Sequence, residues 1–132
     1  MIDYNKNPME NEVYSMNKNT QCLEHGTYKG LNYYIISYSS HPCCYIEIPE
    51  SHKYYKKHYD DIYYDGDIEC HGGLTYSEDH LSILKNSWFI GWDYAHYGDF
   101  SMREHNMFGS SYGDKHSLDK LRQDVYHAID TL

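Results

Sequence analysis

The chain has 132 residues, 11 of them lysine or arginine and 20 aspartate or glutamate, which gives a formal net charge of −9. This length suits one domain with a single core. Nucleic-acid-binding domains usually carry a basic face, and this chain is acidic, so we expect no sequence-specific nucleic-acid partner. No apolar run approaches the roughly 18 residues of a membrane span, and the polar start MIDYNKNPMENE is unlike a signal peptide. These features predict a cytoplasmic protein without a membrane partner.

The first third of the chain predicts two strands after a weakly patterned start. Residues 1–26 show little periodicity, and we expect at most a short helix from Asn11 to Met16. Aromatic and β-branched residues then fill Tyr33–Tyr38 and Cys43–Ile48, with the turn-forming letters SSHP between them, which predicts two strands. Because side chains alternate along a strand, the core face of the second strand should consist of Cys44, Ile46 and Ile48.

The middle of the chain predicts a short helix and then short extended segments. Ser51 suits the N-cap of a helix in SHKYYKKHYDDIYY, which DGD at residues 65–67 should end. The residues at helical spacing are Tyr55, His58, Tyr59, Ile62 and Tyr63. Residues 67–77 predict a short strand, a glycine pair and a second extended run. We expect a helical turn over residues 77–86 and a strand over Trp88–Trp92.

The carboxy-terminal segment predicts an amphipathic helix over residues 117–132. Ser117 suits the N-cap and Asp119 the first turn. The expected apolar stripe comprises Leu118, Leu121, Val125, Ala128 or Ile129, and Leu132. With residues 103–115 as a surface loop, the chain should form one α+β domain over residues 1–132: an antiparallel sheet of four or five short strands, packed by the terminal helix and the short helix.

The segment HGGLT is the first candidate site. Paired glycines at Gly72 and Gly73 permit positive φ angles or a close backbone approach, and exposed amides beside them can bind an anion. Thr75 adds a hydroxyl, and His71 adds a hydrogen-bond donor or a base. The structural alternative is a glycine β-bulge that only bends a strand.

The segment GWDYAHYGD is the second candidate site. Asp93, His96 and Asp99 recur at spacings of three, so the carboxylates can orient the imidazole as a general base. Together with His71, the three can instead bind Zn, Mn or Fe for a hydrolytic reaction. The structural alternative is a hydrogen-bonded turn with His96 exposed to solvent.

Aromatic residues give a third candidate. Trp88 and Trp92 lie four residues apart on one face of the predicted strand, which is usually a core face. Tyr76 or Trp92 could instead form a stacking wall for a purine.

The segments YIEIPESH, HGGLTYS and WFIGWDYAHYGD, followed by the terminal helix, resemble a family of small, largely uncharacterised bacteriophage proteins. The resemblance runs from about His41 to Asp99. The sequence differs at Trp92, where the family usually has phenylalanine, and at Tyr94, where a small residue is frequent. The matching positions are His71, Gly72, Gly73, Leu74, Thr75, Trp88, Gly91, Asp93, Ala95, His96, Gly98 and Asp99.

The resemblance implies a phage counter-defence protein that neutralises a nucleotide signal of bacterial immunity. In the first hypothesis the chain, as a homo-oligomer, sequesters a cyclic nucleotide or cyclic ADP-ribose-type ligand. Phosphate would be held by the Gly72–Gly73 amides, Thr75 and Arg103, and bases would stack on Trp92, Tyr76 or Tyr94. The ribose or base edges would bind His71, Asp93 and His96.

Two other functions remain open at this stage. The first is a phosphodiesterase-like hydrolase, in which His71, Asp93, His96 and Asp99 hold a metal, or His71 and His96 act as an acid–base pair. The second is an inhibitor of a host protein, because the −9 charge can attract a basic partner. The clustering of histidine and aspartate in one segment favours a pocket over an extended acidic surface. No cofactor is expected apart from a possible divalent metal.

Overall fold

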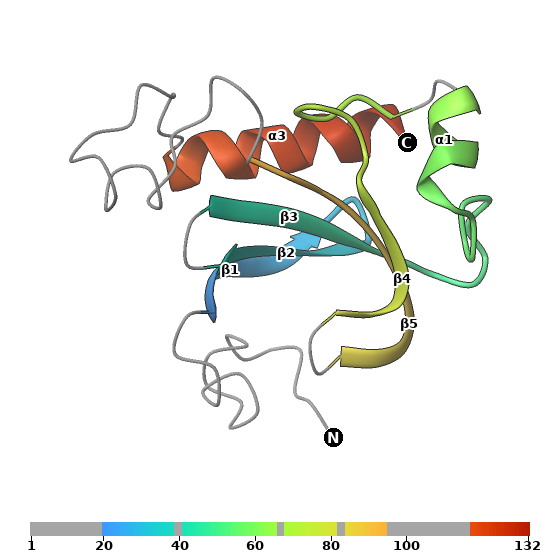
Figure 1. Cartoon of the computed structure of the whole chain (residues 1–132), viewed down its shortest axis with the longest axis horizontal. Helices are drawn as coiled ribbons and strands as arrows, with labels where there is room; N and C mark the ends of the chain where they lie inside the picture. Colours follow the sequence, from blue (N-terminus) through green and yellow to red (C-terminus); the bar gives the residue numbers. More distant parts are fainter. Residues whose placement is uncertain (1–19, 39–40, 66–67, 82–83, 95–116) are drawn as a thin grey trace.

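A computed structural model describes residues 20–38, 41–65, 68–81, 84–94 and 117–132. They form one antiparallel sheet of five strands in the order β1-β2-β3-β5-β4, with helix α3 lying across one face (Figure 1). The strands are β1 (Thr20–Tyr28), β2 (Leu31–Tyr38), β3 (His41–Ile48), β4 (Tyr76–Leu81) and β5 (Leu84–Asp93), and the helices are α1 (Tyr59–Asp65) and α3 (Leu118–Thr131). The predicted α+β fold is confirmed. No helix within these ranges is long and apolar enough to cross a membrane.

Strand β1 lies largely in the region where the sequence predicted little structure. It pairs with β2 through a two-residue turn at Lys29 and Gly30, whose φ angles are +49° and +79°. Two positive φ angles mark the type I′ turn that matches the twist of a hairpin. The expectation of a loose segment up to residue 26 is therefore wrong from Thr20 onward, and the predicted helix from Asn11 to Met16 lies outside the described residues.

The sheet is buried on both faces. On the face toward α3, Cys44, Ile46 and Ile48 pack in one cluster with helix residues, which confirms the predicted core face of β3. The opposite face carries a second cluster that includes Tyr45, which is only 6% exposed. The other members of that cluster are Cys22, Tyr34, Ile36, Cys43, Leu81, Leu84 and Phe89.

The second cluster is closed by the hairpin of β4 and β5, which replaces the helical turn predicted over residues 77–86. The pairing register shifts by two residues between Glu78 and His80, and Asn86 on the facing strand has φ of +64°. Such a bulge bends a strand pair. The bend carries Leu81 and Leu84, each 1% exposed, onto the second face of the sheet. The predicted strand over Trp88–Trp92 lies inside β5 and is confirmed.

Helix α1 begins at Tyr59, seven residues after the start predicted with Ser51 as N-cap, and Ser51 is not its N-cap. Residues 49–57 form successive turns, and Tyr54 between them is only 1% exposed. The predicted helix would place Tyr54 outside its apolar face. Because Tyr54 is buried in the core, that helix cannot form here. His58 occupies the N-cap position instead, because its Nδ1 accepts from the Asp60 N–H at 3.2 Å and its carbonyl accepts from the Ile62 N–H at 3.2 Å.

Helix α3 follows the sequence prediction closely. The Ser117 side chain accepts a hydrogen bond from the Lys120 N–H at 3.1 Å, as an N-cap should. Leu118 is 36% exposed and lies off the buried stripe, contrary to the prediction. The buried residues of the helix are Leu121, Val125, Ala128 and Ile129. The predicted surface loop over residues 103–115 lies outside the described residues.

Candidate functional site

The HGGLT segment forms a tight turn before β4. The described residues just before it, 68–70, form no strand, and no β-bulge occurs at the two glycines. The Gly73 N–H donates to the Cys70 carbonyl at 3.1 Å, and the φ angles of Gly72 and Gly73 are +71° and +82°. A positive φ at the third position of a four-residue turn is typical of type II, where glycine is favoured. Leu74 then enters the core, and the Thr75 N–H donates to the Gly91 carbonyl at 2.9 Å.

This geometry uses one of the two glycine amides that the sequence assigned to an anion, the N–H of Gly73. The amides of Gly73 and Thr75 both hydrogen-bond to carbonyls of the chain, so neither offers a vacant donor to a ligand. The paired glycines are therefore explained by the turn itself.

The HGGLT segment meets the start of the second candidate segment at Asp93 and Tyr94. The Thr75 hydroxyl donates to Asp93 Oδ2 at 3.1 Å. The His71 imidazole stacks on the Tyr94 ring, with 4.5 Å between ring centroids and 15° between planes. The predicted site residues His96, Asp99 and Arg103 lie outside the described residues.

The described members of the predicted site are divided between the two sheet faces. Asp93 lies opposite Cys43 of the second cluster, and the Tyr76 ring packs edge-on against Tyr45 in the same cluster at 5.2 Å. The Tyr76 hydroxyl donates to the His80 carbonyl at 2.6 Å. His71, in contrast, stacks on Tyr94, which packs in the cluster beneath α3. Strand alternation produces this division, since neighbours along β5 point to opposite faces.

Trp92 is a core residue, so the predicted stacking wall is absent at that position. Its side chain is 1% exposed, and its indole N–H donates to the Tyr94 hydroxyl at 3.2 Å. The predicted shared face with Trp88 is confirmed, because Trp88 packs against the same cluster. An indole enclosed by protein has no face to offer a base.

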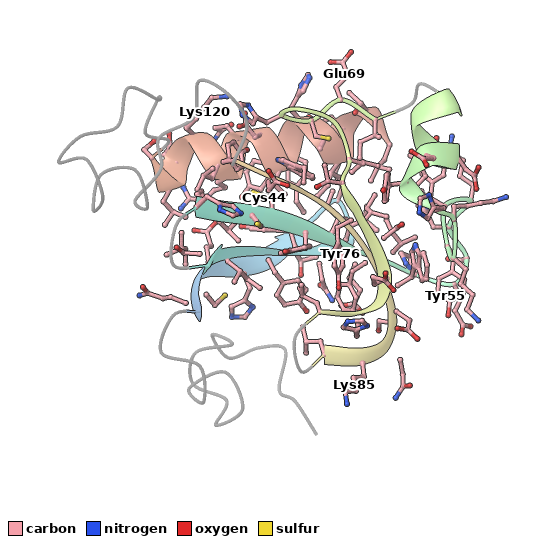
Figure 2. The ribbon with its side chains drawn as sticks, viewed as in Figure 1. Cys44, Tyr55, Glu69, Tyr76, Lys85 and Lys120 are labelled. Atoms are coloured by element: carbon pink, nitrogen blue, oxygen red, sulfur yellow. The ribbon has the colours of Figure 1, made fainter. Side chains whose placement is uncertain are left out.

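An open cleft of about 240 Å³ lies between α3 and the segment before β4. Figure 2 shows Glu69 and Lys120 on the α3 side of the molecule, far from Lys85 at the opposite side. The residues lining the cleft are Glu69, Cys70, His71, Lys120, Asp124 and His127. Of these, only His71 belongs to the site predicted from the sequence.

One ion pair, one histidine–carboxylate contact and a buried tyrosine organise the cleft. His127 Nε2 lies 2.8 Å from Glu69 Oε2. The Lys120 ammonium pairs with Asp124 Oδ1, while Asp124 Oδ2 accepts from the Tyr94 hydroxyl at 2.7 Å. The Glu69 N–H also donates to Thr131 Oγ1 at 2.9 Å. These contacts fix the α3 wall relative to the wall formed by residues 69–71.

Burial keeps two weakly acidic side chains near the cleft protonated, the phenol of Tyr94 and the thiol of Cys70. The pKa of Tyr94 lies well above its ordinary value. Burial is the largest cause, and the nearby Cys44 and the hydrogen bond to Asp124 raise the pKa further. Burial likewise raises the pKa of the Cys70 thiol to about 12. Because the thiolate is the reactive form, Cys70 is not set up as a nucleophile at neutral pH.

Neither His71 nor Asp93 belongs to a compact set of metal donors within the described ranges. Three histidine, cysteine or carboxylate donors gather there only at Glu78, Asp79 and His80, all exposed on β4. Exposed acidic groups are common without a metal. The metal site built on His71, Asp93, His96 and Asp99 stays a prediction, because half of it lies outside the described residues.

Sequence reasoning missed the helical wall of the cleft. Lys120, Asp124 and His127 fall at positions i, i+4 and i+7 of α3, so they form one polar row beside the buried stripe. That spacing was visible in the sequence. Its significance depends on Tyr94 and Glu69, which come from distant parts of the chain.

Comparison with known proteins finds no relative of this chain. No protein family, curated protein or solved structure matches it.

Proposed function

We propose that this protein binds and sequesters a small nucleotide-type ligand, and that the ligand's phosphate lies in the cleft beside α3. The observation that carries the proposal is the convergence of His71, Lys120 and His127 on one opening. Lysine and histidine are donors to phosphate oxygens, and each can carry a positive charge. The bases and any second phosphate would extend beyond the cleft, whose volume of about 240 Å³ suits only part of a nucleotide.

The carboxylates of the cleft set the conditions for binding. Glu69 and Asp124 outnumber the single ammonium of Lys120 while both imidazoles are neutral, and the cations are in excess once both are protonated. Anion binding in the cleft has to overcome the repulsion of a chain with net charge −9.

The resemblance to bacteriophage proteins supports a biological setting for this binding. A phage protein that captures a cyclic nucleotide or cyclic ADP-ribose-type signal would block bacterial immune signalling. We propose a homo-oligomer, which would multiply the number of ligands that each assembly removes.

The proposal is tested with purified protein and a panel of cyclic dinucleotides and cyclic ADP-ribose-type compounds. Unbound compound is filtered away, the protein is heat-denatured, and released material is identified by mass spectrometry. Retention of an intact compound, weakened at least about tenfold in His71→Ala and His127→Ala, is expected. His80→Ala, at an exposed histidine on β4, is the matched control. Full retention in both cleft variants would refute the site, and no retention would direct attention to a host protein partner.

A further inference from the structure

The two imidazoles of the cleft are held in different ways. His127 on α3 lies 2.8 Å from the Glu69 carboxylate. Because an ionised carboxylate only accepts hydrogen bonds, this pair places a proton on Nε2 and leaves Nδ1 as the nitrogen that can take a proton. His71 is oriented by stacking on Tyr94, a residue with no solvent exposure. The fold therefore places one imidazole on each wall of a single opening.

We propose that the cleft cleaves a ribonucleotide phosphodiester, with His127 as general base and His71 as general acid. This inference rests on the proposed function, since it requires the phosphate to lie in the cleft. It differs from the acid–base pair suggested by the sequence, because His127 takes the place given there to His96. The substrate class is a 3′,5′-phosphodiester with a free 2′-hydroxyl beside the phosphorus.

The reaction balances without a further reactant. The ribose 2′-oxygen attacks phosphorus as neutral His127 takes the hydroxyl proton, so a P–O2′ bond forms. The P–O5′ bond breaks, and protonated His71 gives its proton to the departing 5′-oxygen. The products are a 2′,3′-cyclic phosphate and a 5′-hydroxyl. One imidazole gains the proton that the other loses, and the reverse roles activate water for hydrolysis of the cyclic phosphate.

The remaining residues of the cleft have supporting roles in this scheme. The Lys120 ammonium can neutralise charge that develops on the nonbridging oxygens, and its bond to Asp124 keeps it on the α3 wall. Glu69 is a positioning residue, since it acts through the tautomer and orientation of His127. Each member of the imidazole pair should contribute about 100-fold or more to the rate, as general acid–base groups do.

The scheme separates ligands that are cleaved from ligands that are held. A ligand with a hydroxyl next to its phosphodiester supplies its own nucleophile. A 2′-deoxy ligand or a pyrophosphate-linked ligand has no such nucleophile, and would be released from the cleft uncleaved.

The test uses the ribodinucleotide adenylyl-3′,5′-adenosine and its analogue with a 2′-deoxy first sugar, both in EDTA. Cleavage is followed by chromatography, with mass spectrometry for the 2′,3′-cyclic phosphate, and affinity is measured calorimetrically with the analogue. We expect cleavage of the ribodinucleotide alone, with a bell-shaped pH profile, since one imidazole must be neutral and the other protonated. His71→Ala and His127→Ala should each lose about 100-fold or more in rate.

Three comparisons make the outcome decisive. His80→Ala should cleave at the wild-type rate, and Glu69→Gln should shift one limb of the pH profile. If the analogue binds in the cleft but the ribodinucleotide stays whole, the cleavage scheme is overturned and the proposed binding function stands. If neither compound of this pair nor any of the cyclic panel binds, both fail. Cleavage that persists in His71→Ala and His127→Ala would assign the activity elsewhere and overturn the inference.

Discussion

The Tyr94 hydroxyl links the core to the cleft, and its removal tests that link directly. In Tyr94→Phe the ring remains, so packing with Cys44 and the stacking of His71 are preserved. The change removes the bond from the Trp92 indole N–H at 3.2 Å and the bond to Asp124 Oδ2 at 2.7 Å. Both partners stay where the fold has placed them, and each loses a hydrogen-bonding group.

The expected cost follows from the burial of those two partners. Trp92 is 1% exposed, so its N–H can find no water, and an unsatisfied buried donor costs about 1–3 kcal/mol. Asp124 loses a charge-assisted bond, but its side chain is 16% exposed and keeps Lys120 as a partner, so water offsets part of that loss. We expect the free energy of unfolding to fall by about 2–4 kcal/mol.

Urea unfolding at pH 7, followed by tryptophan fluorescence, measures this change. The midpoint should fall while the dependence on urea concentration stays the same, since the surface exposed on unfolding is unchanged. Tyr55→Phe is the matched control, because Tyr55 is half-buried and no described residue hydrogen-bonds its hydroxyl. A loss below about 0.5 kcal/mol in Tyr94→Phe would refute the reasoning, since it would mean that the hydroxyl carries no net interaction.

Three further changes test other parts of the fold by the same unfolding assay. Gly91→Ala should cost about 3 kcal/mol, because its Cβ would lie 2.6 Å from the Cys44 carbonyl oxygen, a backbone atom that cannot rotate away; near-wild-type stability would contradict this crowding. Ser117→Ala should cost about 1 kcal/mol through loss of the α3 N-cap, and Ser117→Asp should retain most of it. The hydrogen bond from Arg122 lowers the pKa of the Glu24 carboxyl in the folded protein. The bond therefore stabilises the fold at pH values above the unfolded pKa of Glu24, and this stabilisation is lost as the pH falls through the folded pKa. Glu24→Gln should therefore destabilise at pH 7 by up to about 1 kcal/mol, and its gap to wild type should shrink toward pH 3; a gap that widens in acid would contradict the assignment.

Local signals were sufficient for much of the fold. The alternation of apolar residues in β3 and the cap and apolar stripe of α3 are properties of short segments, and both were predicted in place. The hairpin of β1 and β2 was predictable in the same way, since Lys29–Gly30 is a turn signal between Tyr28 and Leu31. It was missed because the region before it carries little periodicity.

Other elements depended on contacts that no short segment contains. Residues 51–58 have helical spacing, yet Tyr54 is held in the core and the helix starts only at Tyr59. Residues 77–86 were too short for a firm pattern, and pairing between β4 and β5 made them a hairpin. In both cases long-range burial outweighed local propensity, which is a weak determinant in segments of this length.

The sequence by itself determined the α+β class, the core face of β3 and the terminal helix. Only the tertiary structure decided which residues join His71. Strand alternation directs Asp93 and Tyr76 to the other face of the sheet, while the docking of α3 brings Lys120, Asp124 and His127 to the turn at residues 69–71. The physical reason is that a site joins side chains far apart in the chain. Their convergence is set by how the apolar faces of sheet and helix bury one another, and the local pattern of each segment does not encode that arrangement.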